Sequence, residues 1–399
     1  MKKLFTLAAA GSLAVASLSA QAQVTVDGQL TAAEVSTANY TLVGRYTGTH
    51  GFAPSATNSA GVLALYAAAD ANNIYFFLVA TLQNDGSPAT ISNSLQLLVA
   101  RPGVTGVPVG TALPKPTAST TSFQGFAPYL ELPGDMGIGI KGNGTAAQYQ
   151  VDGVVYAGGT TPTATAAVLS GTTGVAATGA TASITGQTGS LTVFNGAQVA
   201  YRTATSLNTN PGYGTNGAGA VPAYGLEVAL SRASLGLPTA GGAVQVFALQ
   251  NNGGGDYVSS DFIPQNTAAL PASFTAAPNL GANPDFRLVP GTQAATVNVG
   301  ATTGVTLANR ASAAELALGV YPNPVRGAST VTYKVADRAS NVNIVLTDLL
   351  GRTVRTVENG LKPVGTQTAP VDADALAAGT YLMRVQVGDK VSTSKVSVL

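Results

Sequence analysis

The chain has 399 residues, and only 9% of them are charged, against about 25% in an average soluble protein. Its 19 Lys and Arg residues balance 18 Asp and Glu residues, so no basic field exists to attract nucleic acid or an anionic membrane. The absence of cysteine excludes disulfides, thiolate catalysis and Cys-ligated zinc. The single histidine, His50, leaves no multi-histidine metal site.

The first 22 residues have the pattern of a signal peptide. Lys2 and Lys3 precede an apolar stretch over residues 4–18, and the small residues Ser19, Ala20 and Ala22 follow it. This order is typical of a leader that is cleaved after export, here before Gln23. The apolar stretch is too short to span a membrane of about 30 Å comfortably, so we expect a mature protein without a transmembrane segment.

Residues 23–306 are predicted to form a cargo domain. Apolar runs of about five to eight residues lie between turn-forming residues, as in the buried strands of a large antiparallel β-sandwich. The clearest expected strands span residues 24–30, 74–80, 95–100, 224–230 and 244–249. Residues 157–196 are a low-complexity Gly/Thr/Ala insertion, which we expect to be a long surface excursion or a set of weak hairpins.

The composition changes near residue 310. Residues 23–310 carry eight basic and 11 acidic side chains, whereas the much shorter stretch 311–399 carries nine and seven. We place a linker at residues 307–317 and a second domain at 318–399. Apolar residues alternate with polar ones over 331–335, 342–346 and 381–387, and a last strand is expected over 391–398. Strands this short and this closely spaced predict a small immunoglobulin-like β-sandwich, so the fold class is all-β.

Three motifs lie in this second domain. The first is Tyr321, Pro322, Asn323 and Pro324; the second includes Asp348, Gly351 and Arg352; the third includes Gly379 and Tyr381, and Lys395 follows in the last strand. In this order at the C-terminus they resemble the type A sorting domain of the type IX secretion system. The resemblance implies that the type IX machinery carries the cargo across the outer membrane and that the cargo is then attached to the cell surface or released.

The cargo resembles family 9 carbohydrate-binding modules and their DOMON-like relatives. The resemblance rests on the order of Asp27-Gly28, Glu34, residues 72–75, residues 224–230 and residues 256–261. It implies a β-sandwich and a polysaccharide ligand. The sequence has no tryptophan, the side chain that such modules often use to stack sugars.

Catalytic arrangements are weakly represented. His50 lies in a Gly-Thr-His-Gly stretch without a G-x-S-x-G nucleophile motif, and we expect an exposed loop histidine. The cargo carboxylates Glu34, Glu131, Asp135 and Glu227 are the candidates for a glycan-hydrolysing pair. We predict surface or turn positions for most of them. Glu227 lies inside an apolar strand, where a functional role or a buried, paired position is the alternative. We predict no catalytic residues, and a hydrolase only as the alternative.

Two glycine-rich stretches resemble ligand-binding motifs. Residues 137–142 spell G-x-G-x-x-G but lack the following helix of a phosphate site, so we expect a strand there. Residues 253–258 resemble one copy of a calcium-binding repeat, for which we predict a hairpin turn. Calcium bound by Asp256 and Asp261 is the alternative; otherwise we expect no cofactor and no metal.

The sequence therefore predicts a secreted, non-catalytic binding or structural protein, attached to the outer surface of a Gram-negative bacterium or released from it. Its expected partners are the type IX secretion machinery and, as an alternative reading, a polysaccharide.

Overall fold

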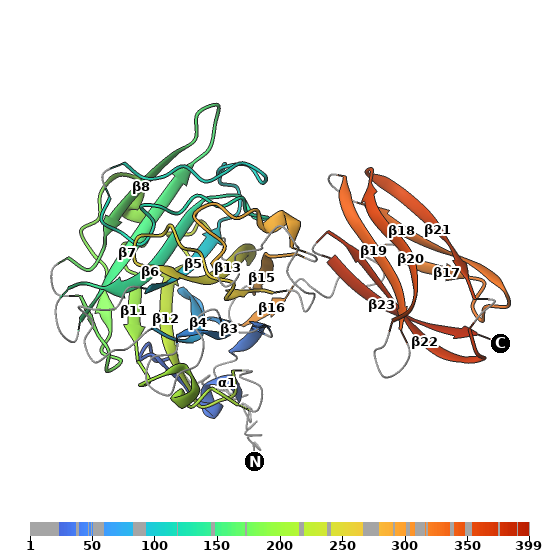
Figure 1. The fold of residues 1–399 in the computed structure, drawn as a ribbon, viewed down its shortest axis with the longest axis horizontal. Coiled ribbons are helices and arrows are strands. Elements are labelled where there is room, and N and C mark those ends of the chain that lie inside the picture. Colours follow the sequence, from blue (N-terminus) through green and yellow to red (C-terminus); the bar gives the residue numbers. More distant parts are fainter. Residues whose placement is uncertain are drawn as a thin grey trace, which may run out of the picture.

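A computed structural model shows two bodies joined near residue 310, the cargo and the tail (Figure 1). The described residues are 24–36, 40–46, 48, 50, 60–82, 93–117, 119–144, 148–171, 174–214, 219–237, 241–265, 279–289, 292–300, 304–307, 316, 318–335, 339–347, 353–373, 376–388 and 390–398. The predicted signal peptide lies outside them. Within them, no helix has the length and hydrophobicity needed to cross a membrane.

The cargo is built from two sheets whose strands pair antiparallel. The seven-stranded sheet contains β1 (Gln29–Leu30), β2 (Thr41–Arg45), β3 (Gly61–Ala69), β4 (Asn73–Thr81), β10 (Ala182–Ser183), β11 (Gln198–Tyr201) and β12 (Ala223–Ser231). The nine-stranded sheet contains β5 (Asn93–Ala100), β6 (Met136–Gly142), β7 (Gln148–Ala157), β8 (Thr163–Val168), β9 (Val175–Ala176), β13 (Gly242–Asn252), β14 (Phe262–Ile263), β15 (Ala295–Val299) and β16 (Val305–Leu307). Helical segments are short: α1 (Ala32–Ser36), η1 (Gly189–Phe194), η2 (Leu207–Thr209) and η3 (Phe286–Leu288).

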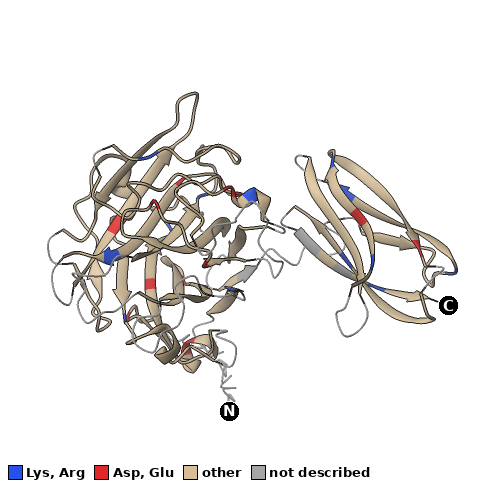
Figure 2. Ribbon diagram, in the orientation of Figure 1, with Lys and Arg blue, Asp and Glu red and all other residues tan. Residues whose placement is uncertain are grey.

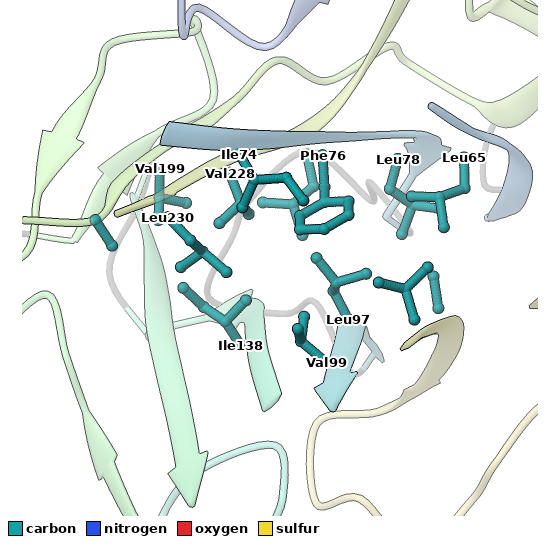
Figure 3. Close-up of a cluster of buried hydrophobic side chains, with 14 of the residues drawn as sticks. Leu65, Ile74, Phe76, Leu78, Leu97, Val99, Ile138, Val199, Val228 and Leu230 are labelled. Atoms are coloured by element: carbon teal, nitrogen blue, oxygen red, sulfur yellow. The ribbon is translucent and has the colours of Figure 1, made fainter. Parts of the chain in front are cut away.

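The central strands are buried on both faces, which explains why they are apolar without alternation. Between the sheets, Phe76 and Leu78 of β4 face Leu97 and Val99 of β5 (Figure 3). A second apolar cluster covers the outer face of the nine-stranded sheet, and it includes Phe123, Phe126, Phe247, Phe262 and Phe286. A third covers the outer face of the seven-stranded sheet, and it includes Leu30, Tyr40, Leu63, Phe77 and Leu207. The long connections between strands supply these covers, so the cargo has three apolar layers around two sheets.

The Gly/Thr/Ala-rich segment 157–196 is part of this sandwich. Its strand β8 pairs with β7 at one edge of the nine-stranded sheet, and β10 pairs with β11 at one edge of the other sheet. Leu169, Ile184 and Phe194 are buried in the core between the sheets. The expectation of a surface excursion is therefore corrected, whereas the alternative of hairpins agrees with the β7–β8 and β10–β11 pairs. The segment forms edge strands of both sheets and closes the core at that end.

The tail is a separate sandwich of two antiparallel sheets. One contains β17 (Gly319–Tyr321), β18 (Ala328–Val335) and β21 (Gly365–Asp372). The other contains β19 (Ser340–Thr347), β20 (Thr353–Lys362), β22 (Gly379–Val387) and β23 (Lys390–Val398). The alternation expected from the sequence is confirmed, because Val331, Tyr333 and Val335 point into the tail's own core.

The expected linker begins and ends in folded structure. Leu307 ends β16, which pairs with β15 in the cargo. Leu316 is buried in the tail core, and its carbonyl oxygen accepts a hydrogen bond from the Lys334 N–H. Leu307 therefore belongs to the cargo and Leu316 to the tail. Charged residues are few and scattered over both bodies (Figure 2).

Candidate functional site

The first sorting motif contacts the last strand, β23, at one end of the tail. In the sheet register Thr347 lies opposite Leu382, and Leu382 lies opposite Lys395. The Asn323 Nδ2 donates to the Lys395 carbonyl oxygen at 2.9 Å, and the Ser397 N–H donates to the Asn323 Oδ1 at 3.0 Å. One amide side chain therefore holds the first motif to a strand that follows it by 72 residues.

The first motif is exposed along its whole length. All four residues of 321–324 are exposed, and the Tyr321 side chain is 82% exposed. Directly after them Val325 is buried, and its N–H donates to the Ser397 carbonyl oxygen at 2.7 Å. The backbone of the motif is thus anchored on the last strand while its side chains face solvent.

The third motif closes the turn before β22. Gly379 pairs with Val398 at this same end of the sheet. The Tyr381 hydroxyl donates to the Ala377 carbonyl oxygen at 2.8 Å, which braces the turn. Asp348, Gly351 and Arg352 of the second motif lie outside the described residues. The preceding strand β19 ends at Thr347, which lies opposite Leu382 of β22 in the sheet.

The opposite end of the tail contacts the cargo. The Thr292 hydroxyl of the cargo donates to the Gly388 carbonyl oxygen at 3.1 Å and accepts from the Gln386 Nε2 at 3.5 Å. Gly388 follows the last residue of β22, whereas Gly379 begins that strand. The motif end and the cargo contact are therefore at opposite ends of one nine-residue strand.

Glu227 in the cargo is completely buried at the middle of β12. It accepts hydrogen bonds from the Tyr40 hydroxyl at 2.8 Å and from the N–H groups of Asp27 and Gly28 at 2.9 and 3.0 Å. Burial raises the pKa of Glu227 to about 8, while these three hydrogen bonds oppose the increase. The carboxyl group fastens the Asp-Gly turn to the sheet, so Glu227 has the buried, paired position that its place inside an apolar strand allowed.

The other candidate carboxylates serve separate structural contacts. Glu34 accepts from the Thr31 N–H and hydroxyl at 2.9 and 3.0 Å, which caps the short helix α1. Asp135 is buried and receives two parallel hydrogen bonds from Arg101 at 2.8 and 2.7 Å. Each of these carboxylates therefore has hydrogen-bond partners of its own.

Glu131 is held by the backbone beside β15. Its Oε2 accepts from the Gln293 N–H. Burial raises the pKa of Glu131 to about 7, and the Gln293 hydrogen bond opposes that increase. The carboxyl group therefore ties the loop that contains Glu131 to the segment that also carries the tail contact Thr292.

His50 is enclosed, contrary to the expectation of an exposed loop histidine. Its side chain is 9% exposed, and its Nδ1 lies 2.7 Å from the Oδ2 of the fully buried Asp261. The imidazole also packs against the Tyr46 ring with a centroid distance of 4.7 Å. A buried carboxylate requires such a partner, and sequence spacing gave no sign of it because 211 residues separate the pair.

The two aspartates of the calcium alternative have different surroundings. Asp256 is exposed in the turn after β13, and its Oδ1 accepts from the Asn252 Nδ2 at 2.6 Å. Asp261 instead faces His50. Within the described part of the chain, no group of three His, Cys, Asp or Glu residues could hold a metal ion. Calcium binding stays an untested prediction.

A buried polar network under the 253–258 turn was not anticipated. Residues 137–142 form β6, as expected, and Lys141 at its end donates to the carbonyl oxygens of Thr120 and Gly253 at 2.6 and 2.9 Å. The nearby Asp152 is buried and accepts from the Ser122 N–H at 2.7 Å. Burial raises the pKa of Asp152 to about 6. The lysine and the aspartate fix the loops that cover this sheet face.

A groove of about 570 Å³ opens between the edges of the two cargo sheets. Small uncharged residues line it, among them Ser170, Gly171, Thr181, Ser183 and Gln187. The lining offers hydrogen-bonding groups but neither an ionisable side chain nor an aromatic ring.

Comparison with solved structures gives only distant similarity. Dimeric latent PorU from Porphyromonas gingivalis has 13% identity and a TM-score of 0.18, covering 83% of this chain and 32% of that one. PorZ, a type IX secretion surface component of the same organism, has 12% identity and a TM-score of 0.17, covering 84% and 45%. The BSP domain of a biofilm-associated protein has 7% identity and a TM-score of 0.17, covering 90% and 53%. This chain thus spans about a third of the PorU chain.

The sequence comparisons are specific for the tail. A search of curated proteins found no match. The profile of the secretion system C-terminal sorting domain matches residues 319–399, which are the two sheets and the converging motifs described above. The chain therefore ends in a type IX secretion C-terminal sorting domain, a tail that implies export of the protein from the cell.

Proposed function

We propose that the protein is a non-catalytic binding or structural protein that the type IX secretion system delivers to the outer surface of a Gram-negative bacterium or releases outside it. The observation that carries the proposal is the sorting domain at residues 319–399, folded as a sandwich with a core of its own. A cargo domain with separate cores precedes it.

The carboxylates of the cargo support a non-catalytic role. Hydrolysis of a glycoside requires two carboxyl groups that face one substrate space, roughly 5–10 Å apart. Here Glu227 accepts hydrogen bonds from the Asp27-Gly28 turn, Asp135 pairs with Arg101, and Asp261 pairs with His50. Each of these groups stabilises the sandwich through bonds that a substrate would have to break.

Carbohydrate binding is the alternative within this proposal. In a sequence without tryptophan, tyrosine would supply the flat surface on which a sugar stacks. Tyr257 is 37% exposed beside the turn after β13 and is the described cargo residue best placed for that role.

Export is tested by expressing the full chain, and a variant without residues 319–399, in a bacterium that has a type IX system. We expect the full chain in the medium or on the surface, and the truncated chain in the periplasm. The full chain should also stay in the periplasm of a strain whose type IX translocon is deleted. Surface display of the truncated chain would overturn the proposal.

The biochemical part is tested with the purified full chain on a panel of polysaccharides and a glycan array. We expect neither turnover nor retention. Turnover that disappears in Glu227→Gln would replace the proposal with a hydrolase. Retention that disappears in Tyr257→Ala would narrow the proposal to its carbohydrate-binding alternative.

A further inference from the structure

The motif end of the tail points away from the cargo. Strand β22 runs from Gly379 at the motif end to Val387, next to the Gly388 turn that contacts Thr292. Nine residues in a strand extend about 27 Å at roughly 3.4 Å per step. The C-terminus accordingly lies at the far side of the tail from the cargo (Figure 1). A partner can approach this end without meeting the first domain.

The exposed first motif is held rigidly. Asn323 is bonded on both sides of its amide to the last strand, and the Ser329 hydroxyl donates to the Pro322 carbonyl oxygen at 2.8 Å. Prolines on either side of Asn323 restrict the backbone further. With the backbone fixed, binding needs to order only the side chain itself. Tyr321 is therefore an exposed aromatic side chain carried by a restrained backbone.

Two basic side chains accompany the tyrosine. Arg326 and Lys395 are both exposed, and neither takes part in the ion pairs found among the described residues. Arg326 follows Val325, which pairs with Val398 of the last strand. Exposed cations at the same end of the tail as an exposed aromatic side chain match a partner surface with an apolar pocket and acidic residues beside it.

We propose that Tyr321, Asn323, Arg326 and Lys395 form one docking surface for a protein of the type IX machinery. Tyr321 enters an apolar pocket of that protein, and Arg326 and Lys395 face acidic residues around it. Asn323 is the positioning residue, because it fixes the first motif on the last strand. The proposal rests on the proposed export function and adds which surface of the tail the type IX machinery binds.

The variants Tyr321→Ala and Lys395→Glu test the surface in the full chain, with export measured as the ratio of extracellular to periplasmic protein. Val364→Ala and Lys334→Glu are the matched controls. Both control side chains are exposed and lie near the Val335–Gly365 pair, at the end of β18 remote from the Tyr321–Thr330 pair. We expect each test variant to reduce the ratio at least about fivefold and each control to leave it within about twofold.

Asn323 is tested with two replacements. Asn323→Asp keeps the acceptor for the Ser397 N–H and loses the donor to Lys395, whereas Asn323→Ala loses both. We expect a graded fall in export, larger for Ala than for Asp. Equal export by both variants and the wild type would remove Asn323 from the surface.

A photocrosslinking amino acid at position 321 separates recognition from folding. We expect a crosslink to a protein of the type IX translocon, identified by mass spectrometry, and none from position 364. If Tyr321→Ala is exported like the wild type while the chain without residues 319–399 is retained, the surface is wrong and the export function stands. If the truncated chain is exported too, the export function itself fails.

Discussion

The Tyr40 hydroxyl donates to the Glu227 carboxylate at 2.8 Å, although both side chains are enclosed by the sandwich. Tyr40 follows α1, so the bond ties the start of the cargo to the middle of β12. Tyr40→Phe keeps the ring and removes only the hydroxyl. We expect the free energy of unfolding to fall by about 1–3 kcal/mol, because a buried acceptor loses a partner.

Urea denaturation of the full chain measures this change. Tyr321→Phe is the control, because its hydroxyl belongs to a side chain that is 82% exposed. It should change the stability by no more than about 0.5 kcal/mol. Equal effects of the two replacements would show that the Tyr40 bond does not stabilise the fold.

Glu227 should make the stability depend on pH. Burial raises its pKa from 4.5 to about 8, so the folded chain holds the proton at pH values where the unfolded chain has released it. The stabilisation is complete below about pH 4.5 and is lost as the pH rises to about 8. Between these limits the wild type should lose up to about 5 kcal/mol relative to Glu227→Gln. Parallel stability curves for the two proteins would contradict this assignment.

The Arg101–Asp135 pair should contribute far more than the Arg287–Asp285 pair. Both have two parallel N–H···O bonds, but Asp135 is buried whereas Asp285 and Arg287 are partly open to solvent. Arg101→Ala leaves a buried carboxylate without its cation and should cost about 3–5 kcal/mol. Arg287→Ala should cost at most about 1 kcal/mol. Denaturant unfolding of both variants makes the comparison, and similar losses would contradict the role of burial.

The Gly/Thr/Ala-rich segment should be essential for stability despite its composition. Phe194 ends η1 and is fully buried in the core between the sheets. Phe194→Ala should destabilise the cargo by about 3–5 kcal/mol. Thr163→Ala, at an exposed position of the same segment, should stay within about 0.5 kcal/mol of the wild type in thermal unfolding. A mild effect of Phe194→Ala would restore the view of the segment as a surface excursion.

His50 should be chemically protected. It is the only histidine in the chain, so carbethoxylation by diethylpyrocarbonate followed by its absorbance reports on one site. Enclosure beside Asp261 and Tyr46 predicts a reaction several-fold slower than in the urea-unfolded chain. Reaction at the same rate in both states would mean that the imidazole is open to solvent.

The strands could be predicted where local pattern and burial agree. The run at residues 74–80 is apolar at every position, and the structure encloses it as β4 between two apolar layers. The alternation at 331–335 likewise became β18, with one face in the tail core. The 157–196 segment could not be read this way, because its small residues carry little apolar signal. Its burial follows from pairing with β7 and β11, which is set by the tertiary fold.

The interaction partners of the candidate residues could not be predicted from the sequence either, because they also depend on the tertiary fold. Asp261 and His50, or Glu227 and Tyr40, meet only after strands distant in the chain have paired. A carboxylate inside an apolar run, as at Glu227, signals that some partner exists without saying which one. The sorting motifs were recognisable because their order along the chain is itself the signal. That Asn323 lies against Lys395 required the fold.

The independence of the two hydrophobic interiors has a further consequence. Among the described residues, those that fill the tail's interior belong to the tail, and hydrogen bonds at Thr292 link the two bodies. Amino-acid changes inside one sandwich are therefore free to accumulate without repacking the other. A lineage of bacteria could join the same tail to unrelated first domains by recombination near residue 310, and each new fusion would inherit a route out of the cell.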